Sequence, residues 1–212
     1  MHRTLLPLLL ALAGAAQAAE RSPAGTYRLT GEPDVASRLR LGADGRFDYF
    51  LVAGALDERV RGRWRSAGRA VTLITEPKPV PPEFSRLAPA STDSAPLTVR
   101  VSWPDGSGIA LVDLRVGFDS GPPAAGYTQE EGWSLSPEEK RIPRWIELAV
   151  PMHGLASPRF PIDLAEGNAL AFRLAPNDLG VVDFDGMAVD VEENALIVHR
   201  GGARLRYQRA RE

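Results

Sequence analysis

The sequence predicts an all-β protein built from antiparallel strands. From Ala24 onward, apolar residues recur with a period of two, and turns that contain glycine separate the runs. In the first and last blocks of strands one side is apolar and the other is rich in arginine, which is typical of an antiparallel sheet that packs on one face only. A chain of 212 residues has room for one large β domain or two small ones.

The first block of strands reads as a meander. Its expected strands are 25–31, 36–42, 46–54, 59–65 and 69–75. Asp44-Gly45 precedes the third strand and can adopt the positive φ angles of a tight hairpin. In the fourth strand, arginines alternate with Val60, Gly62 and Trp64, so we expect Trp64 to point into the core and the arginines into solvent.

If the arginines of that strand pointed inward instead, the sequence would predict a different kind of barrel. Arginines that line a lumen would make an anion-binding barrel or a membrane barrel. A membrane barrel needs strands of about 9–11 residues, and these strands are shorter. Burying so many guanidinium groups would also require as many carboxylates beside them. The solvent-facing orientation is therefore the one that we expect.

The composition changes after the fifth strand. Residues 76–96 are dense in proline and small polar residues, which favours an extended connection. Five longer strands follow at 96–103, 109–118, 126–135, 144–150 and 168–174, with one capped helical turn at 136–139. Three closing strands at 181–191, 195–200 and 203–209 again separate apolar residues from arginines.

Short motifs in both terminal blocks resemble the small bacterial lipocalin-like barrels. These motifs are "GTYRL", "ADGRF", "GRWR", "VTL" and "FDGMAVDVEENALIVHRGGARLRYQR". The middle segments "LTVRVSWPDGSGIALVDLRVGF" and "YTQEEGWSL" resemble the transthyretin-like or carboxypeptidase-regulatory β-sandwich. Together the resemblances imply a lipocalin-like barrel into which a sandwich is inserted.

The predicted fold is an eight-stranded lipocalin-like antiparallel barrel that an inserted β-sandwich interrupts. Five strands before the proline-rich segment and three after the sandwich make eight, the number that closes a small barrel. The predicted layout is a signal peptide at 1–18, the barrel at 19–76 and 180–212, a proline-rich linker at 77–96 and the sandwich at 97–179. The alternative is two sequential β domains that meet near the linker.

The N-terminus predicts export. A basic start at Arg3 and an apolar run from Leu5 to Ala16 precede Ala16-Gln17-Ala18, a pattern typical of a signal peptide. No later apolar run is longer, so we expect no membrane insertion. The chain has no cysteine, so neither a disulfide nor a lipid on cysteine is expected. These observations predict a periplasmic or secreted protein, and a formal net charge of −2 argues against a nucleic-acid partner.

Candidates for catalysis or metal binding are few. The sequence lacks a G-x-S-x-G elbow, and after signal cleavage only His153 and His199 remain, so we expect an enzyme least of the three classes considered. "DFDG" at 183–186 begins like a calcium loop, but the third oxygen ligand is missing. The acidic residues around it are expected to be solvated, and no metal or cofactor is predicted.

The first functional hypothesis is therefore a non-catalytic binding module. Four aromatic residues are the candidates to line a barrel mouth for a small apolar or amphipathic ligand: Phe47, Tyr49, Trp64 and Tyr207. A closed and filled core is the alternative role of the same residues. The second hypothesis is a cell-envelope structural or interaction protein whose sandwich docks a protein or glycan. Its candidate anchors are Trp103, Trp133 and Trp145, although core positions are the alternative for them too.

Overall fold

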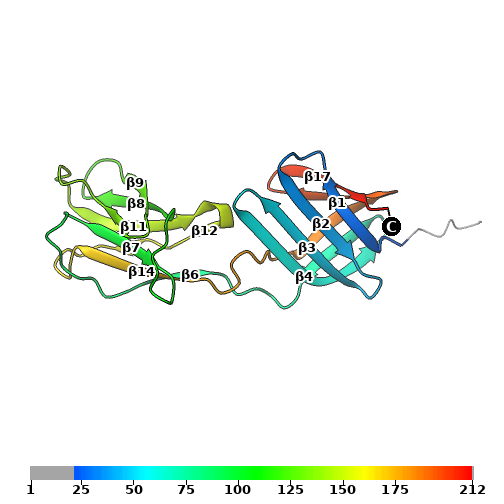
Figure 1. Cartoon of the computed structure of the whole chain (residues 1–212), viewed down its shortest axis with the longest axis horizontal. Helices are drawn as coiled ribbons and strands as arrows, with labels where there is room; N and C mark the ends of the chain where they lie inside the picture. Colours follow the sequence, from blue (N-terminus) through cyan, green and yellow to red (C-terminus); the bar gives the residue numbers. More distant parts are fainter. Residues whose placement is uncertain (1–21, 212) are drawn as a thin grey trace, which may run out of the picture.

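The structure is a computed structural model that describes residues 22–211. The predicted signal peptide at 1–18 lies outside these residues. Figure 1 shows a barrel at one end of the molecule and a second group of sheets at the other, joined by two extended connections. Within the described residues, no helix is long and apolar enough to cross a membrane.

Eight antiparallel strands close a barrel in the order β1-β17-β16-β15-β5-β4-β3-β2. The strands are β1 (Gly25–Thr30), β2 (Val35–Leu41), β3 (Arg46–Ala53), β4 (Leu56–Ala67), β5 (Ala70–Thr75), β15 (Asp185–Glu192), β16 (Ala195–Arg200) and β17 (Ala203–Arg209). Because β15 pairs with β5 and β17 pairs with β1, the barrel draws strands from both ends of the chain. The predicted interrupted barrel is confirmed, and the alternative of two sequential domains is wrong.

The barrel is built by the alternation seen in the sequence. Leu39 and Leu41 on β2 are buried, whereas Arg38 and Arg40 between them are exposed. The same alternation on most of the barrel strands fills the interior with apolar side chains, whereas β16 is buried at four consecutive positions. Burial of this surface stabilises the fold by roughly 25 cal/mol per Å². The arginines of β4 between Arg59 and Arg65 therefore face outward, as expected.

The segment between β5 and β15 forms two further sheets. The first has the order β10-β7-β14-β6 and contains β6 (Glu83–Arg86), β7 (Thr98–Ser102), β10 (Trp133–Ser134) and β14 (Ala169–Ala175). The second has the order β12-β11-β8-β9, with β13 paired to β11. It contains β8 (Asp113–Phe118), β9 (Ala124–Tyr127), β11 (Pro143–Val150), β12 (Leu155–Ala156) and β13 (Phe160–Pro161). Val99 and Phe172 of the first sheet share one core with Leu114 and Ile146 of the second, so the two sheets form a β-sandwich.

Three of the predicted elements differ from the structure. The proline-rich segment contains a strand, β6, which pairs with β14 at the edge of the sandwich. The strand expected at 126–135 is two strands, β9 and β10, in different sheets. A tight turn separates them, in which Gly132 has a φ of 118° and a Cβ would lie 2.6 Å from the Val99 carbonyl oxygen. At 136–139 the chain forms a hydrogen-bonded turn and not the expected turn of helix. A 3.0 Å hydrogen bond from the Glu139 N–H to the Ser136 carbonyl closes it.

Two other expected strands begin later than predicted. β8 starts at Asp113 instead of residue 109, because Leu111 has a φ of 61° that breaks the strand. β15 starts at Asp185 instead of residue 181, because Val181 and Val182 pair with Arg59 of β4.

Candidate ligand-binding groove

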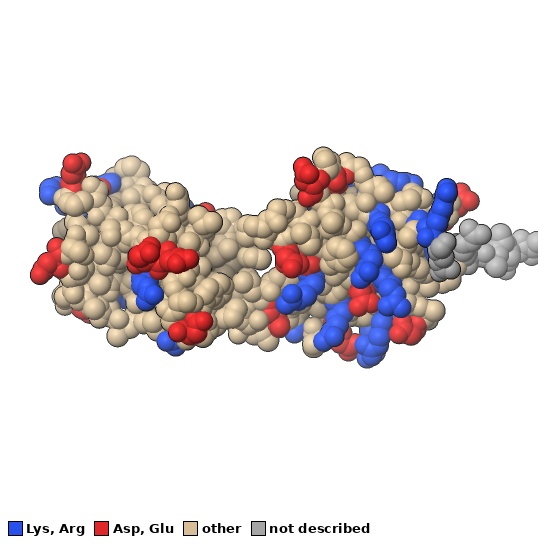
Figure 2. Space-filling view, viewed as in Figure 1, with Lys and Arg blue, Asp and Glu red and all other residues tan. Residues whose placement is uncertain are grey.

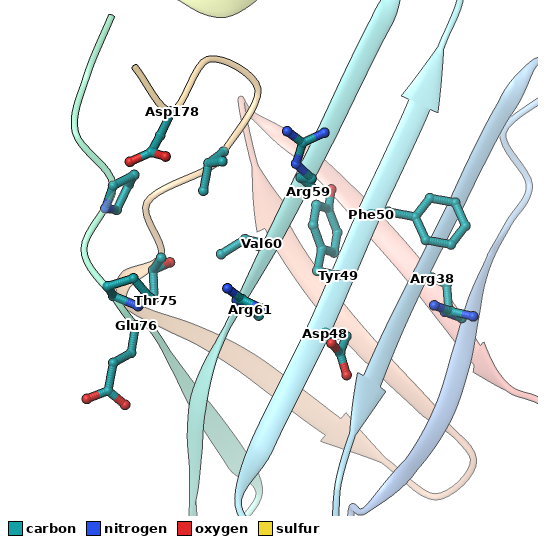
Figure 3. Close-up of a pocket in the computed structure, with 13 residues that line it drawn as sticks. Arg38, Asp48, Tyr49, Phe50, Arg59, Val60, Arg61, Thr75, Glu76 and Asp178 are labelled. Atoms are coloured by element: carbon teal, nitrogen blue, oxygen red, sulfur yellow. The ribbon is translucent and has the colours of Figure 1, made fainter. Parts of the chain in front are cut away.

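A groove of about 520 Å³ lies on the outside of the barrel where the two connections to the sandwich meet it. Its lining residues come from β2 to β5 and from both connections (Figure 3): Arg38, Asp48, Tyr49, Phe50, Arg59, Val60, Arg61, Thr75, Glu76, Pro77, Pro79, Asp178 and Val181. A volume of this size suits a small molecule. We refer to it as the groove.

The floor of the groove is the outer face of three neighbouring strands. Phe50 on β3 is paired in register with Arg38 on β2 and with Arg59 on β4. The Arg38 guanidinium lies 5.2 Å from the centre of the Phe50 ring, at a distance suited to a cation–π contact. Cross-strand pairing thus places an aromatic ring between two arginines, and Arg61 extends the row along β4.

The wall of the groove is formed where the returning connection docks on β4. The Arg59 N–H donates to the Gly180 carbonyl at 2.8 Å, and the Val182 N–H donates to the Arg59 carbonyl at 3.1 Å. At Gly180 the φ is 79°, and a Cβ would lie 2.8 Å from the Asp57 carbonyl oxygen, so this close approach requires glycine.

The two connections also hold each other. The Asp178 carboxylate accepts a 2.7 Å hydrogen bond from the Val80 N–H, and the Asp178 N–H donates to the Val80 carbonyl at 3.1 Å. The Asn177 side-chain amide donates to the Pro81 carbonyl at 2.7 Å. These bonds fix the groove wall by pairing segments that lie almost a hundred residues apart in the sequence.

The carboxylates that line the groove are already engaged. Asp48 lies 3.5 Å from Arg40, and Glu76 lies 2.5 Å from Arg63. The third, on Asp178, accepts the backbone hydrogen bond from Val80.

The arginines of the groove are not engaged in this way. Arg38, Arg59 and Arg61 form no ion pair with any residue of 22–211, and all three are exposed. The groove therefore presents three guanidinium groups, each with donors free for a bidentate hydrogen bond to an anion.

Like charges also face each other on this surface. Arg28 is paired in register with Arg38, and Arg46 is paired with Arg63. Like charges placed directly opposite across strands destabilise a sheet by a few tenths of a kcal/mol. In Figure 2, basic side chains gather over the barrel, whereas the same view of the sandwich shows few of them.

The four aromatic residues predicted to line a ligand site lie inside the barrel. Phe47, Tyr49 and Tyr207 are buried, and the first two pack against Phe184, a residue that the sequence analysis did not single out. Trp64 is partly buried and donates through its indole Nε1 to the Gly42 carbonyl at 2.8 Å. Tyr49 also belongs to the lining of the groove. A role for these residues in ligand binding stays a prediction.

A polar cluster lies inside the barrel at the end that faces the connections. Arg200 on β16 forms a bidentate ion pair with Glu58 on β4, with one bond of 2.7 Å, and donates to the Tyr49 hydroxyl at 3.3 Å. The Tyr207 hydroxyl lies 2.9 Å from the Ser37 hydroxyl, and burial raises the pKa of Tyr207.

The sequence analysis missed this cluster, but the sequence contains the signal for it. Glu58 alternates onto the same face as Val60, and Arg200 onto the same face as Val198. Each is a charged residue at the end of an inward-facing apolar row, which suggests a partner on another strand.

The remaining chemical candidates lie apart from the groove. His199 lies 3.1 Å from the Asp190 carboxylate on the exposed outer face of β15 and β16, and His153 lies in the short 3-10 helix η1 (Pro151–His153). Within residues 22–211, no group of three histidine or acidic side chains is placed to hold a metal ion.

The three tryptophans predicted to anchor a partner of the sandwich all pack against other side chains. Trp103 and Trp133 pack against the sandwich core. Trp145 is partly buried and lies under the Arg159 guanidinium, which is 4.1 Å from the ring centre. A shallow depression on β8, β9 and β11 includes the half-exposed ring of Tyr127.

Comparisons with known proteins found no match to this chain. No family model matches the chain. No curated protein and no solved structure matches it either.

Proposed function

We propose that the chain is an exported, non-catalytic binding protein whose ligand is a small amphipathic molecule with a negative charge. The observation that carries the proposal is the row of three arginines around Phe50 in the groove. Such a site combines a planar apolar surface with bidentate donors for a carboxylate, sulfate or phosphate group.

The position of the groove supports the same proposal. Ligand sites commonly form where separate structural units meet, and this groove lies where the connections to the sandwich cross the barrel. Pro77, Pro79 and Val181 supply apolar surface beside the charged row. A ligand with an acidic head and an apolar body would contact both surfaces.

A fluorescent amphipathic anion, 1-anilinonaphthalene-8-sulfonate, tests the proposal. We expect saturable binding to the folded protein and at least a fivefold loss of affinity in the Arg59→Gln/Arg61→Gln double variant. Arg173→Gln, on the exposed face of sandwich strand β14, is the matched control and should bind like the wild type. Equal affinity of the double variant and the wild type would overturn the proposal.

The second candidate is the docking of an envelope protein or glycan through the sandwich. The half-exposed Tyr127 in the depression on β8, β9 and β11 favours it, since exposed aromatic rings are enriched in binding surfaces. The substitution Tyr127→Ala would weaken capture of such a partner and leave binding of the fluorescent anion unchanged.

A further inference from the structure

The groove continues along β4 into a second depression. The two depressions share Asp48, Arg61, Glu76 and Pro77, so they form one continuous track on the outside of the barrel. The second depression adds Arg40, Arg46 and Arg63 to the arginines of the groove. We use the word track for the two depressions together.

The track carries six arginines and four carboxylates, and all four carboxylates are engaged. The arginines are Arg38, Arg40, Arg46, Arg59, Arg61 and Arg63, and the carboxylates are Asp44, Asp48, Glu76 and Asp178. Beyond the three carboxylates of the groove, Asp44 accepts a 3.1 Å hydrogen bond from the Arg46 N–H. Only Arg40 and Arg63 form ion pairs within residues 22–211.

The spacing of these arginines is regular. Arg59, Arg61 and Arg63 occupy alternate positions of one strand, so their Cα atoms lie about 7 Å apart in a line. Arg46 lies opposite Arg63, and Arg38 and Arg40 run along β2 on the far side of β3. A line of regularly spaced cations fits a chain with regularly spaced anions better than it fits one compact anion.

We propose that the track binds an extended acidic polysaccharide, with successive acidic groups meeting successive arginines. This inference rests on the proposed function, because the first half of the track is the groove. The Arg46–Arg63 pairing supports it, since Glu76 offsets only the charge of Arg63 and a bound anion would offset that of Arg46.

Two other polyanions fit the track less well. Proteins that bind single-stranded nucleic acid stack successive bases on several aromatic rings. Three aromatic residues within residues 22–211 line the track, but Phe47 and Tyr49 are buried, which leaves Phe50 on the outer face. An anionic membrane presents a flat surface, whereas the track is a furrow on the convex face of a barrel. A polysaccharide does not need several aromatic rings, because a single saccharide ring can stack on Phe50.

Calorimetric titration with galacturonic acid oligomers of two, four and eight units tests the inference at 50 mM salt. We expect affinity to rise at least tenfold from the dimer to the octamer and to fall steeply in 300 mM salt. The variant Arg46→Gln changes only the far half of the track, because Arg46 lines the second depression alone and forms no ion pair within residues 22–211. It should therefore weaken octamer binding at least twofold and leave dimer binding unchanged, while Arg173→Gln leaves both unchanged.

The outcomes separate the two proposals. If the dimer and octamer bind equally well in the groove, the inference is overturned and the proposed function stands. If neither the oligomers nor 1-anilinonaphthalene-8-sulfonate binds, both fall. Tighter binding of an eight-residue oligothymidylate, or of phosphatidylglycerol vesicles, than of the octamer would overturn the assignment to a polysaccharide.

Discussion

The ion pair between Glu58 and Arg200 is predicted to hold one end of the barrel closed. The two residues lie on β4 and β16, which are separated in the barrel by β5 and β15, so their contact crosses the interior. Their side chains are 12% and 31% exposed, which makes the pair largely buried. We expect the substitution Glu58→Gln to leave the Arg200 guanidinium inside the barrel without its counter-charge.

Breaking a fully buried ion pair costs about 3–5 kcal/mol. Because Arg200 keeps partial access to water, we expect a loss near the lower end, about 3 kcal/mol in the free energy of unfolding. For a chain of this length that corresponds to a fall in Tm of about 6–12 °C. Urea denaturation followed by circular dichroism, together with calorimetry, measures both quantities.

Two further variants make this prediction sharp. Glu193→Gln removes an exposed glutamate in the turn before β16 that forms no ion pair within residues 22–211, so it should change stability by less than about 0.5 kcal/mol. Glu58→Leu/Arg200→Met replaces the pair by apolar side chains and should regain most of the lost stability. A Glu58→Gln protein as stable as the wild type would refute the closure of the barrel by this pair.

Three other predictions address the track, the barrel and a surface carboxylate. Arg46→Gln should raise the free energy of unfolding by about 0.3 kcal/mol at low salt, because it removes repulsion from Arg63. The gain should vanish in 0.5 M salt, and an unchanged urea midpoint at low salt would contradict the prediction. Gly62→Ala should destabilise the barrel by about 2 kcal/mol or more, because the added Cβ would collide with the Ile74 carbonyl oxygen. An unaltered Tm would show that β4 and β5 can move apart at this position without cost. The Glu139 carboxylate accepts hydrogen bonds from Arg141, which lower its pKa to about 2 from 4.5. Its contribution to stability is therefore complete above about pH 4.5 and is lost as the pH falls through 2, and a side-chain NMR titration near 4.5 would contradict this.

The barrel was predictable because its strands carry a local signal. Alternation of Leu39 and Leu41 with Arg38 and Arg40 decides which face is buried, and it does so without knowledge of the partner strand. The outward orientation of the arginines follows from the same alternation. The split between β9 and β10 was missed, because Tyr127, Trp133 and Leu135 all stand at odd positions and so fit one continuous strand, whereas the turn between them depends on the φ of Gly132.

The groove depends on contacts between distant segments, which strand patterns do not reveal. Its wall forms because Gly180 and Val182 pair with Arg59, and because Asp178 pairs with Val80. The sequence analysis placed a ligand among inward-facing aromatics such as Phe47 on β3, whereas the charged groove lies on the outer side of β2 to β4. The arginines were noted early, but their shortage of acidic partners depends on which carboxylates are engaged elsewhere.

The central claim is that the groove on the outside of β2 to β4 binds an amphipathic anion. The most direct test is an NMR titration of ¹⁵N-labelled protein with 1-anilinonaphthalene-8-sulfonate, read residue by residue. We predict the largest shifts at Phe50, at Arg59 and Arg61, and along the connections at 76–79 and 178–181. Shifts centred on Tyr127 in the sandwich, or on Tyr207 inside the barrel, with the groove unchanged, would contradict the claim.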